Sequence, residues 1–167
     1  NNIVLNNGTF GYDTYVKYTL NTTEFYIKEF TNEFYDNTEY EGVKIGSVNV
    51  FEPINGFKGH FDGDGHIIYG LYVYSKNNAS LFTNLSGEID SLYVSNALIS
   101  GNNSGILSNN ITSGSVSNVM VDGYILSDIY TGSDGVLDFD ETHTVSGGIS
   151  AYSSDSTFIN CINKANI

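Results

Sequence analysis

An internal repeat is the feature of this 167-residue sequence that most restricts the folds open to it. Residues 87–96 align without a gap with residues 114–123. The apolar side chains that match in the two copies are Ile89 with Val116, Leu92 with Val119, and Val94 with Val121. Repeats of this length cannot bury an apolar face alone, so they become stable by stacking on one another.

A third copy, at residues 156–163, follows after a longer gap. It places Phe158 and Cys161 at the first two apolar positions, and the polar Asn163 interrupts the third. Between the copies lie shorter motifs, each followed by a polar, turn-rich stretch. These motifs are at residues 79–82, 104–107 and 147–150. Each repeat therefore contains two or three short strands.

The composition agrees with short strands joined by tight corners. Ile, Val, Leu, Tyr and Phe supply most of the apolar residues, and these side chains suit a pleated surface. Eighteen glycines and many Asn, Ser, Asp and Thr residues, against a single proline, supply turns. We expect an all-β fold, a parallel β-helix (β-solenoid) with insertion loops, in which equivalent strands pair at about 4.8 Å and the matched apolar side chains line the interior.

Two segments interrupt the repeats. Residues 128–142 are rich in glycine and acidic side chains, so we expect an insertion loop at one edge of a coil. Residues 31–46 form a second insertion between expected strands at 25–30 and 48–54.

The repeats suggest one continuous domain whose N-terminal part differs from the stacked repeats that follow it. Alternating Tyr and Val residues before Leu20 indicate strands. We expect residues 1–47 to form an N-terminal cap or first coil with its insertion, and residues 48–167 to form the stacked repeats.

The segment FKGHFDGDGHIIYGLY, residues 57–72, resembles the signature F-x-G-x-F-D-G-N-G-H-x-I-x-G-L of bacterial GLUG-type β-helix repeats. In that family an aromatic-Pro-Ile motif precedes the signature, as residues 51–54 do here. The resemblance covers roughly residues 48–167. It implies a right-handed parallel β-helix from a secreted or surface-attached bacterial protein, and it identifies no activity. Because the sequence stops within a repeat at Ile167, we expect it to be part of a larger polypeptide.

Charge and hydropathy exclude several classes of partner. The formal net charge is −13, and all six basic residues are lysines, so nucleic acid and anionic membranes are not expected partners. No apolar run is long enough to span a bilayer, so we expect no membrane insertion, and an export signal would lie outside this segment.

Cys161 is the single cysteine, and its apolar neighbours predict a small buried residue rather than a nucleophile.

The run Asp62-Gly-Asp-Gly-His66 places two carboxylates and an imidazole within one short segment. Such a group could coordinate a hard cation or act as an acid and base. Asp and Gly also build sharp corners, with side-chain oxygens capping backbone amides, and the resembling family has the same corner. We predict turn residues here. His60, His66 and His143 lie on separate segments and make no zinc pattern.

The best candidate for a metal site is the acidic insertion. Its oxygen ligands would be Asp134, Asp138, Asp140 and Glu141. Calcium needs several such oxygens, but the spacing differs from that of an EF-hand, and a solvated acidic loop is the competing interpretation. Calcium is therefore the only cofactor that the sequence suggests.

Tyrosines are the best candidates for ligand contacts. Ring faces can bind sugars, and we single out Tyr69, Tyr72, Tyr74 and Tyr93. The sequence has no tryptophan, and outward tyrosines on a β-surface often form cross-strand stacks instead.

These features predict a non-catalytic extracellular or cell-surface module for adhesion, recognition or structural display. Its partners would be a glycan or a host or cell-surface protein, together with adjacent domains of the same polypeptide. One alternative is a carbohydrate-binding or accessory module of a glycan-degrading protein. A polysaccharide lyase or glycosidase is a further alternative, and it would need carboxylates converging with a lysine in one cleft.

Overall fold

The computed structural model describes residues 1–6, 49–75, 77–126 and 145–167. Outside these ranges it gives the backbone of short strands that pair antiparallel, β2 with β5, β3 with β4, and β18 with β19. Their bounds are β2 (Thr9–Phe10), β3 (Thr14–Leu20), β4 (Thr23–Glu29), β5 (Phe34–Tyr35), β18 (Tyr130–Thr131) and β19 (Leu137–Asp138).

The other strands stack in four parallel sheets, which we number 1 to 4 in the order in which the chain visits them from Ile54 onward. Sheet 1 contains β6 (Ile54–Asn55), β11 (Phe82–Thr83), β15 (Ser108–Thr112) and β21 (Ser150–Ser154). Sheet 2 contains β7 (His60–Asp62), β12 (Glu88–Asp90), β16 (Ser115–Ser117) and β22 (Thr157–Ile159).

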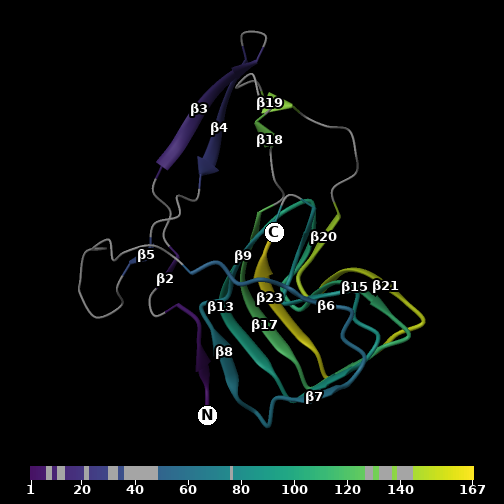
Figure 1. The fold of residues 1–167 in the computed structure, drawn as a ribbon. Helices are drawn as coiled ribbons and strands as arrows, with labels where there is room; N and C mark the ends of the chain where they lie inside the picture. Colours follow the sequence, from purple (N-terminus) through teal and green to yellow (C-terminus); the bar gives the residue numbers. More distant parts are fainter. Residues whose placement is uncertain are drawn as a thin grey trace.

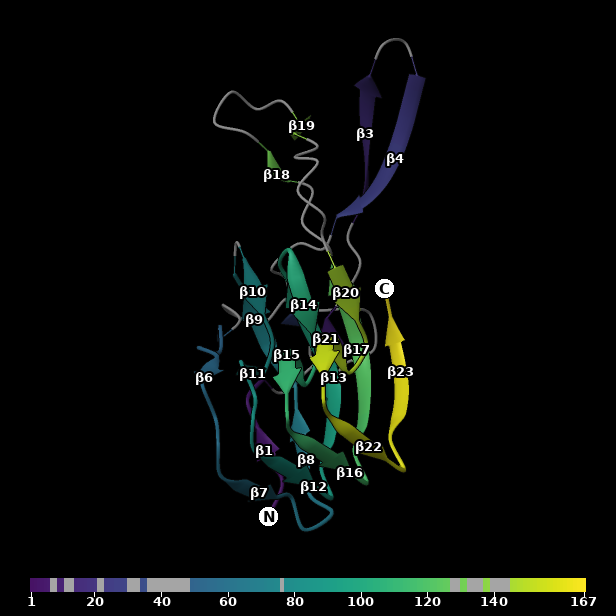
Figure 2. The same ribbon diagram turned by 90° about the vertical axis from the view of Figure 1, so that its right-hand side faces the viewer.

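The third and fourth sheets complete each coil. Sheet 3 contains β1 (Ile3–Val4), β8 (Ile67–Tyr69), β9 (Tyr72–Tyr74), β13 (Tyr93–Ser100), β17 (Met120–Leu126) and β23 (Ile162–Asn166). Sheet 4 contains β10 (Asn78–Ala79), β14 (Asn103–Gly105) and β20 (Val145–Gly147). Figure 1 shows the sheet 3 strands β8, β13, β17 and β23 side by side, and Figure 2 shows the same stacking in sheets 1 and 2.

The chain runs from sheet 1 to sheet 2, then to sheets 3 and 4, and back to sheet 1 one level further on. We number the coils by their sheet 2 strands, so that β7, β12, β16 and β22 belong to coils 1, 2, 3 and 4. The predicted all-β parallel β-helix is therefore confirmed. Its right-handed sense stays a prediction.

The repeat found in the sequence is the stacking register. Ile89 pairs with Val116 and Val94 pairs with Val121, which is the alignment predicted from the two copies. Phe158 stacks on Val116 and Asn163 stacks on Val121, also as predicted. The matched apolar residues are buried, with at most 3% of each residue exposed. They are Ile89, Leu92, Val94, Val116, Val119 and Val121.

An insertion lies between coils 3 and 4. Ser115 pairs with Thr157, which lies further along the chain than one repeat, and the extra residues fall between β17 and β20. This is the place where the sequence predicts the insertion at residues 128–142, which lie outside the described residues apart from the backbone of β18 and β19. At the other end of the chain, β1 pairs with β8 and so adds one more strand to sheet 3.

The corner between sheets 2 and 3 repeats from coil to coil. Ser91, Asn118 and Asn160 each adopt φ 52°, the left-handed conformation that Asn tolerates better than most residues. The side-chain Nδ2 of Asn160 donates to Asn118 Oδ1 at 3.2 Å, and the side-chain Nδ2 of Asn118 donates to Asp90 Oδ1 at 2.9 Å. A ladder of side-chain hydrogen bonds thus joins coils 2, 3 and 4 at this corner.

The interior is closed in the middle of the stack and open at coil 4. Val116 is fully buried, whereas its partner Phe158 in coil 4 is 40% exposed. Cys161, which the sequence predicts to be buried, is half-buried against the core, and its thiol donates to the Val116 carbonyl at 3.4 Å. Within the described parts of the chain, no helix is long and apolar enough to cross a membrane.

Candidate functional site

The run from Asp62 to His66 forms a tight turn, as predicted. Asp64 and Gly65 have φ values of 48° and 69°, and the His66 amide donates to the Gly63 carbonyl at 2.8 Å. Two consecutive positive φ values with this bond define the Asp-Gly turn of type I′. Asp62 Oδ1 also accepts the Asp64 amide at 2.9 Å, the capping bond expected of a turn aspartate.

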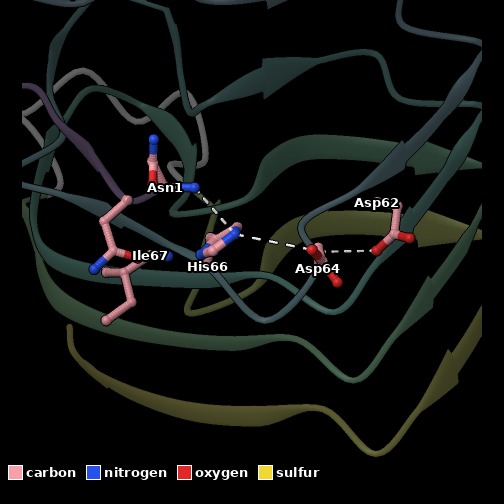
Figure 3. A network of polar contacts seen from close by, with 6 residues as sticks. Asn1, Asp62, Asp64, His66 and Ile67 are labelled. Carbon is pink, nitrogen blue, oxygen red and sulfur yellow. Dashed lines mark hydrogen bonds and ion pairs between the residues drawn. The ribbon is translucent and has the colours of Figure 1, made fainter.

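Figure 3 shows the polar contacts around this turn. His66 Nε2 lies 3.9 Å from Asp64 Oδ2 and 3.1 Å from the backbone nitrogen of Asn1. The Asp64 side chain is 89% exposed and the His66 side chain 47%, so the pair is solvated and adds little stability. Asn2 Oδ1 accepts the Ile67 amide at 3.0 Å, which helps to fix β1 on the edge of sheet 3.

The predicted calcium ligands lie outside the residues whose side chains the structure describes. These are Asp134, Asp138, Asp140 and Glu141, so the calcium site stays a prediction. Among the described residues, no group of three or more His, Cys, Asp and Glu side chains is arranged to hold a metal ion.

The four tyrosines singled out for sugar binding lie on sheet 3 but differ in exposure. Tyr74 is 61% exposed, Tyr69 and Tyr93 are half-buried, and Tyr72 is only 4% exposed. Tyr72 therefore presents no ring face to solvent, and the four rings do not form one exposed row. Sugar binding at the other three stays a prediction.

The hydroxyl group of Tyr93 is occupied by a contact within the protein. It donates to the Asp122 carboxylate, which also accepts the Asn96 amide at 2.7 Å. These contacts lie at a bulge between Val94 and Ala97 in the pairing of β13 with β17. The hydrogen bond to Asp122 needs the protonated hydroxyl. This bond therefore raises the pKa of Tyr93 above its usual value.

A groove of about 480 Å³ lies beside sheet 2 and crosses all four coils. Three columns of equivalent residues line it. One side is formed by Lys58, Ser86, Ser113 and Asp155, and the other by His60, Glu88, Ser115 and Thr157. The floor is formed by Gly59, Gly87 and Gly114.

Close approach of successive coils explains the glycine floor. Glu88 donates its amide to the Gly59 carbonyl at 2.9 Å, and Ser115 donates to the Gly87 carbonyl at 3.1 Å. A Cβ atom on Gly87 would lie 2.2 Å from the Gly59 carbonyl oxygen. The backbone at Gly87 therefore has no room for a side chain, and the residues on either side of the glycine column form the two walls of the groove.

No apolar side chain lines the groove, and its ionisable side chains are a lysine, a histidine and two carboxylic acids. Coil 1 contributes Lys58 and His60, coil 2 contributes Glu88, and coil 4 contributes Asp155. Serine and threonine hydroxyls fill the positions between them. Such a lining can form many hydrogen bonds, but it offers no apolar pocket for an anchoring side chain.

The sequence singled out none of these residues as a candidate for binding, and it identified His60 only as a histidine that makes no zinc pattern. The available signal was the recurrence of glycine at positions 59, 87 and 114. Each of these glycines directly precedes a residue of the column His60, Glu88 and Ser115, which pair with one another in β7, β12 and β16. The sequence could therefore have indicated a column of positions without side chains along sheet 2.

Asp90 lies on the outward face of sheet 2, in the same strand as Glu88 of the groove. The Ser117 hydroxyl donates to Asp90 Oδ1 at 2.7 Å, and the side-chain Nδ2 of Asn118 donates to the same oxygen. Both bonds favour the charged carboxylate, Ser117 most strongly, so the pKa of Asp90 lies below its ordinary value of 3.8.

We expect the substitution Ser117→Ala to raise the pKa of Asp90 toward 3.8, as measured by the NMR titration of its carboxyl carbon. A lowered folded-state pKa adds stability above the unfolded-state pKa, and this stability disappears as the pH falls through the folded-state value. The variant should therefore lose less stability than the wild type on acidification below pH 3.8. The matched variant Ser115→Ala, in the same strand, should leave the Asp90 titration unchanged, and an equal shift in both variants would contradict the assignment.

Comparison with models of protein families found no match, and searches of curated proteins and of solved structures found none either.

Proposed function

We propose that this chain is a non-catalytic recognition module of an extracellular or cell-surface bacterial protein, built from GLUG-type repeats. The observation that carries the proposal is the groove, because it crosses four coils and repeats similar polar positions at each level. A ligand that uses such a site would be an extended polymer rather than a compact small molecule. The rigid solenoid would hold the contact positions at fixed intervals.

The GLUG-type assignment is supported by the positions of the signature glycines. A Cβ atom on Gly63 would lie 2.5 Å from the Ser91 carbonyl oxygen in the next coil. Gly70 has φ 71°, and a Cβ atom there would lie 2.1 Å from the Asn6 carbonyl oxygen. The signature Phe57 and Phe61 pack their rings against Phe82 of coil 2, with centroids 5.2 and 6.0 Å away. The signature residues thus serve coil stacking, which is what a repeat signature of a β-helix would encode.

Glycan cleavage is the second candidate, because the groove holds a lysine together with two carboxylates. Lys58, Glu88 and Asp155 lie in coils 1, 2 and 4, so the two carboxylates are two coil steps apart, which is about 10 Å along the stack. Retaining glycosidases hold their two carboxyl groups about 5 to 5.5 Å apart, and inverting enzymes about 6.5 to 9.5 Å apart. This spacing favours binding over acid and base catalysis.

Binding and product release, measured together, test the proposal. The purified chain would be immobilised and exposed to soluble polysaccharides and to the matrix proteins collagen and fibronectin. We expect saturable binding to at least one of these polymers and no new reducing ends or unsaturated products. Product formation would contradict the non-catalytic assignment. Failure to bind any of the polymers would contradict recognition and favour a structural spacer.

A further inference from the structure

We propose that the groove beside sheet 2 binds a neutral, linear glycan whose chain runs parallel to the axis of the solenoid. This inference rests on the proposed function, since it names the class of polymer that the recognition module takes. It depends on the chemistry of the lining, the spacing of the coils, and the charge of the chain.

The lining favours a glycan over a polypeptide. Hydroxyl groups of Ser86, Ser113, Ser115 and Thr157 can each donate and accept, as can the hydroxyls of a sugar. Glu88 and Asp155 add acceptors, and the Lys58 ammonium group adds donors. Protein partners usually bind through buried aromatic or aliphatic anchors in apolar pockets, and this groove has no apolar side chain in its lining.

The spacing of the coils suits a polymer of sugar rings. Equivalent groove positions recur at each coil, since His60, Glu88, Ser115 and Thr157 pair in register. Parallel strands repeat at about 4.8 Å, which is close to the length of one sugar ring with its glycosidic link. Each coil would therefore face one sugar. Four coils span about 14 Å, so the groove would accommodate about four sugars.

The charge of the protein favours a neutral glycan. The chain carries a net charge of −13, and the groove contains one lysine against two carboxylates. A polyanion such as a polyuronate would be repelled by the chain as a whole. The hydroxyls of a neutral glycan can hydrogen-bond to the carboxylates without that repulsion, and such bonds to charged groups are stronger than neutral ones.

Chain length is the first test of this inference. We would titrate the protein with neutral, linear β-linked oligosaccharides of glucose, xylose, mannose and N-acetylglucosamine, two to six rings long. For at least one series, affinity should rise at least tenfold from two to four rings and then level off. Oligogalacturonate of the same length should bind at least tenfold more weakly. Failure of all four neutral series, or preference for the anionic series, would overturn the inference.

Blocking the groove is the second test. Ser115→Tyr places a ring over the middle of the groove from an outward strand position, and Ser86→Tyr does so from the exposed opposite wall. Each should weaken oligosaccharide binding at least tenfold. The control is Asn166→Tyr, on the outward face of β23 in sheet 3, which should leave the affinity unchanged. Thermal unfolding of all three variants would establish that they are folded, and Ser86→Tyr is informative if Ser115→Tyr is unstable.

The outcomes separate this inference from the proposed function. If the wild type binds a neutral oligosaccharide and both folded groove variants retain that affinity, the groove is not the site, whereas the recognition function stands. If a matrix protein binds and the groove variants abolish its binding, the glycan class is wrong. If the wild type binds neither glycans nor matrix proteins, both the inference and the proposed function fall.

Discussion

Replacing Phe82 by alanine is expected to lower the free energy of unfolding by about 3 to 5 kcal/mol, the usual cost of deleting a buried aromatic ring. Phe82 is 1% exposed and its ring packs against Phe57 at 5.2 Å and Phe61 at 6.0 Å between centroids. Truncation would leave a cavity between coils 1 and 2. Urea denaturation followed by far-ultraviolet circular dichroism would measure the loss.

The matched control is Phe158→Ala, which removes the same atoms from coil 4. Because Phe158 is 40% exposed and has no coil on its other side among the described residues, we expect a loss of about 1 kcal/mol. Equal losses in the two variants would contradict the conclusion that the interior is closed in the middle of the stack and open at coil 4. Such a result would indicate that coil 4 is covered in solution.

Gly87→Ala is expected to destabilise the protein by about 3 kcal/mol, the upper end of the usual cost of overpacking, although it adds a single methyl group. The new Cβ atom would lie 2.2 Å from the Gly59 carbonyl oxygen and 2.8 Å from the Lys58 carbonyl carbon, both backbone atoms that cannot rotate away. That same Gly59 oxygen accepts the Glu88 amide, so relief of the clash would break the ladder between coils 1 and 2. Thermal unfolding would report the effect as a lowered midpoint.

A second glycine variant provides the comparison for this steric effect. Gly65 has φ 69° and no heavy atom within 4 Å of its added Cβ, so Gly65→Ala incurs only conformational strain of about 1 to 2 kcal/mol. We expect Gly87→Ala to be clearly the more destabilising of the two. The reverse order would show that coils 1 and 2 do not approach each other closely at the groove floor.

The sequence alone determined the parallel stacking, its period and its interior residues. This was possible because each coil repeats the same local pattern, so that Ile89 and Val116 occupy equivalent positions and are recognisable as such without coordinates. The interruption of the third apolar position by Asn163 was predictable for the same reason. The turn at residues 62–66 was predictable because Asp-Gly pairs favour positive φ through purely local interactions.

Only the tertiary structure decided which polar residues form a common surface. Lys58, Glu88 and Asp155 are far apart in the sequence, and each is an ordinary polar residue in its own segment. Stacking brings them to one groove, where the glycine column lies between the two walls. Likewise, Tyr72 and Tyr74 are alike in sequence, but one is 4% exposed and the other 61%, since burial depends on what packs over each ring. A repeat encodes which residues align, whereas the shape and chemistry of the outer surface arise only once the coils are stacked.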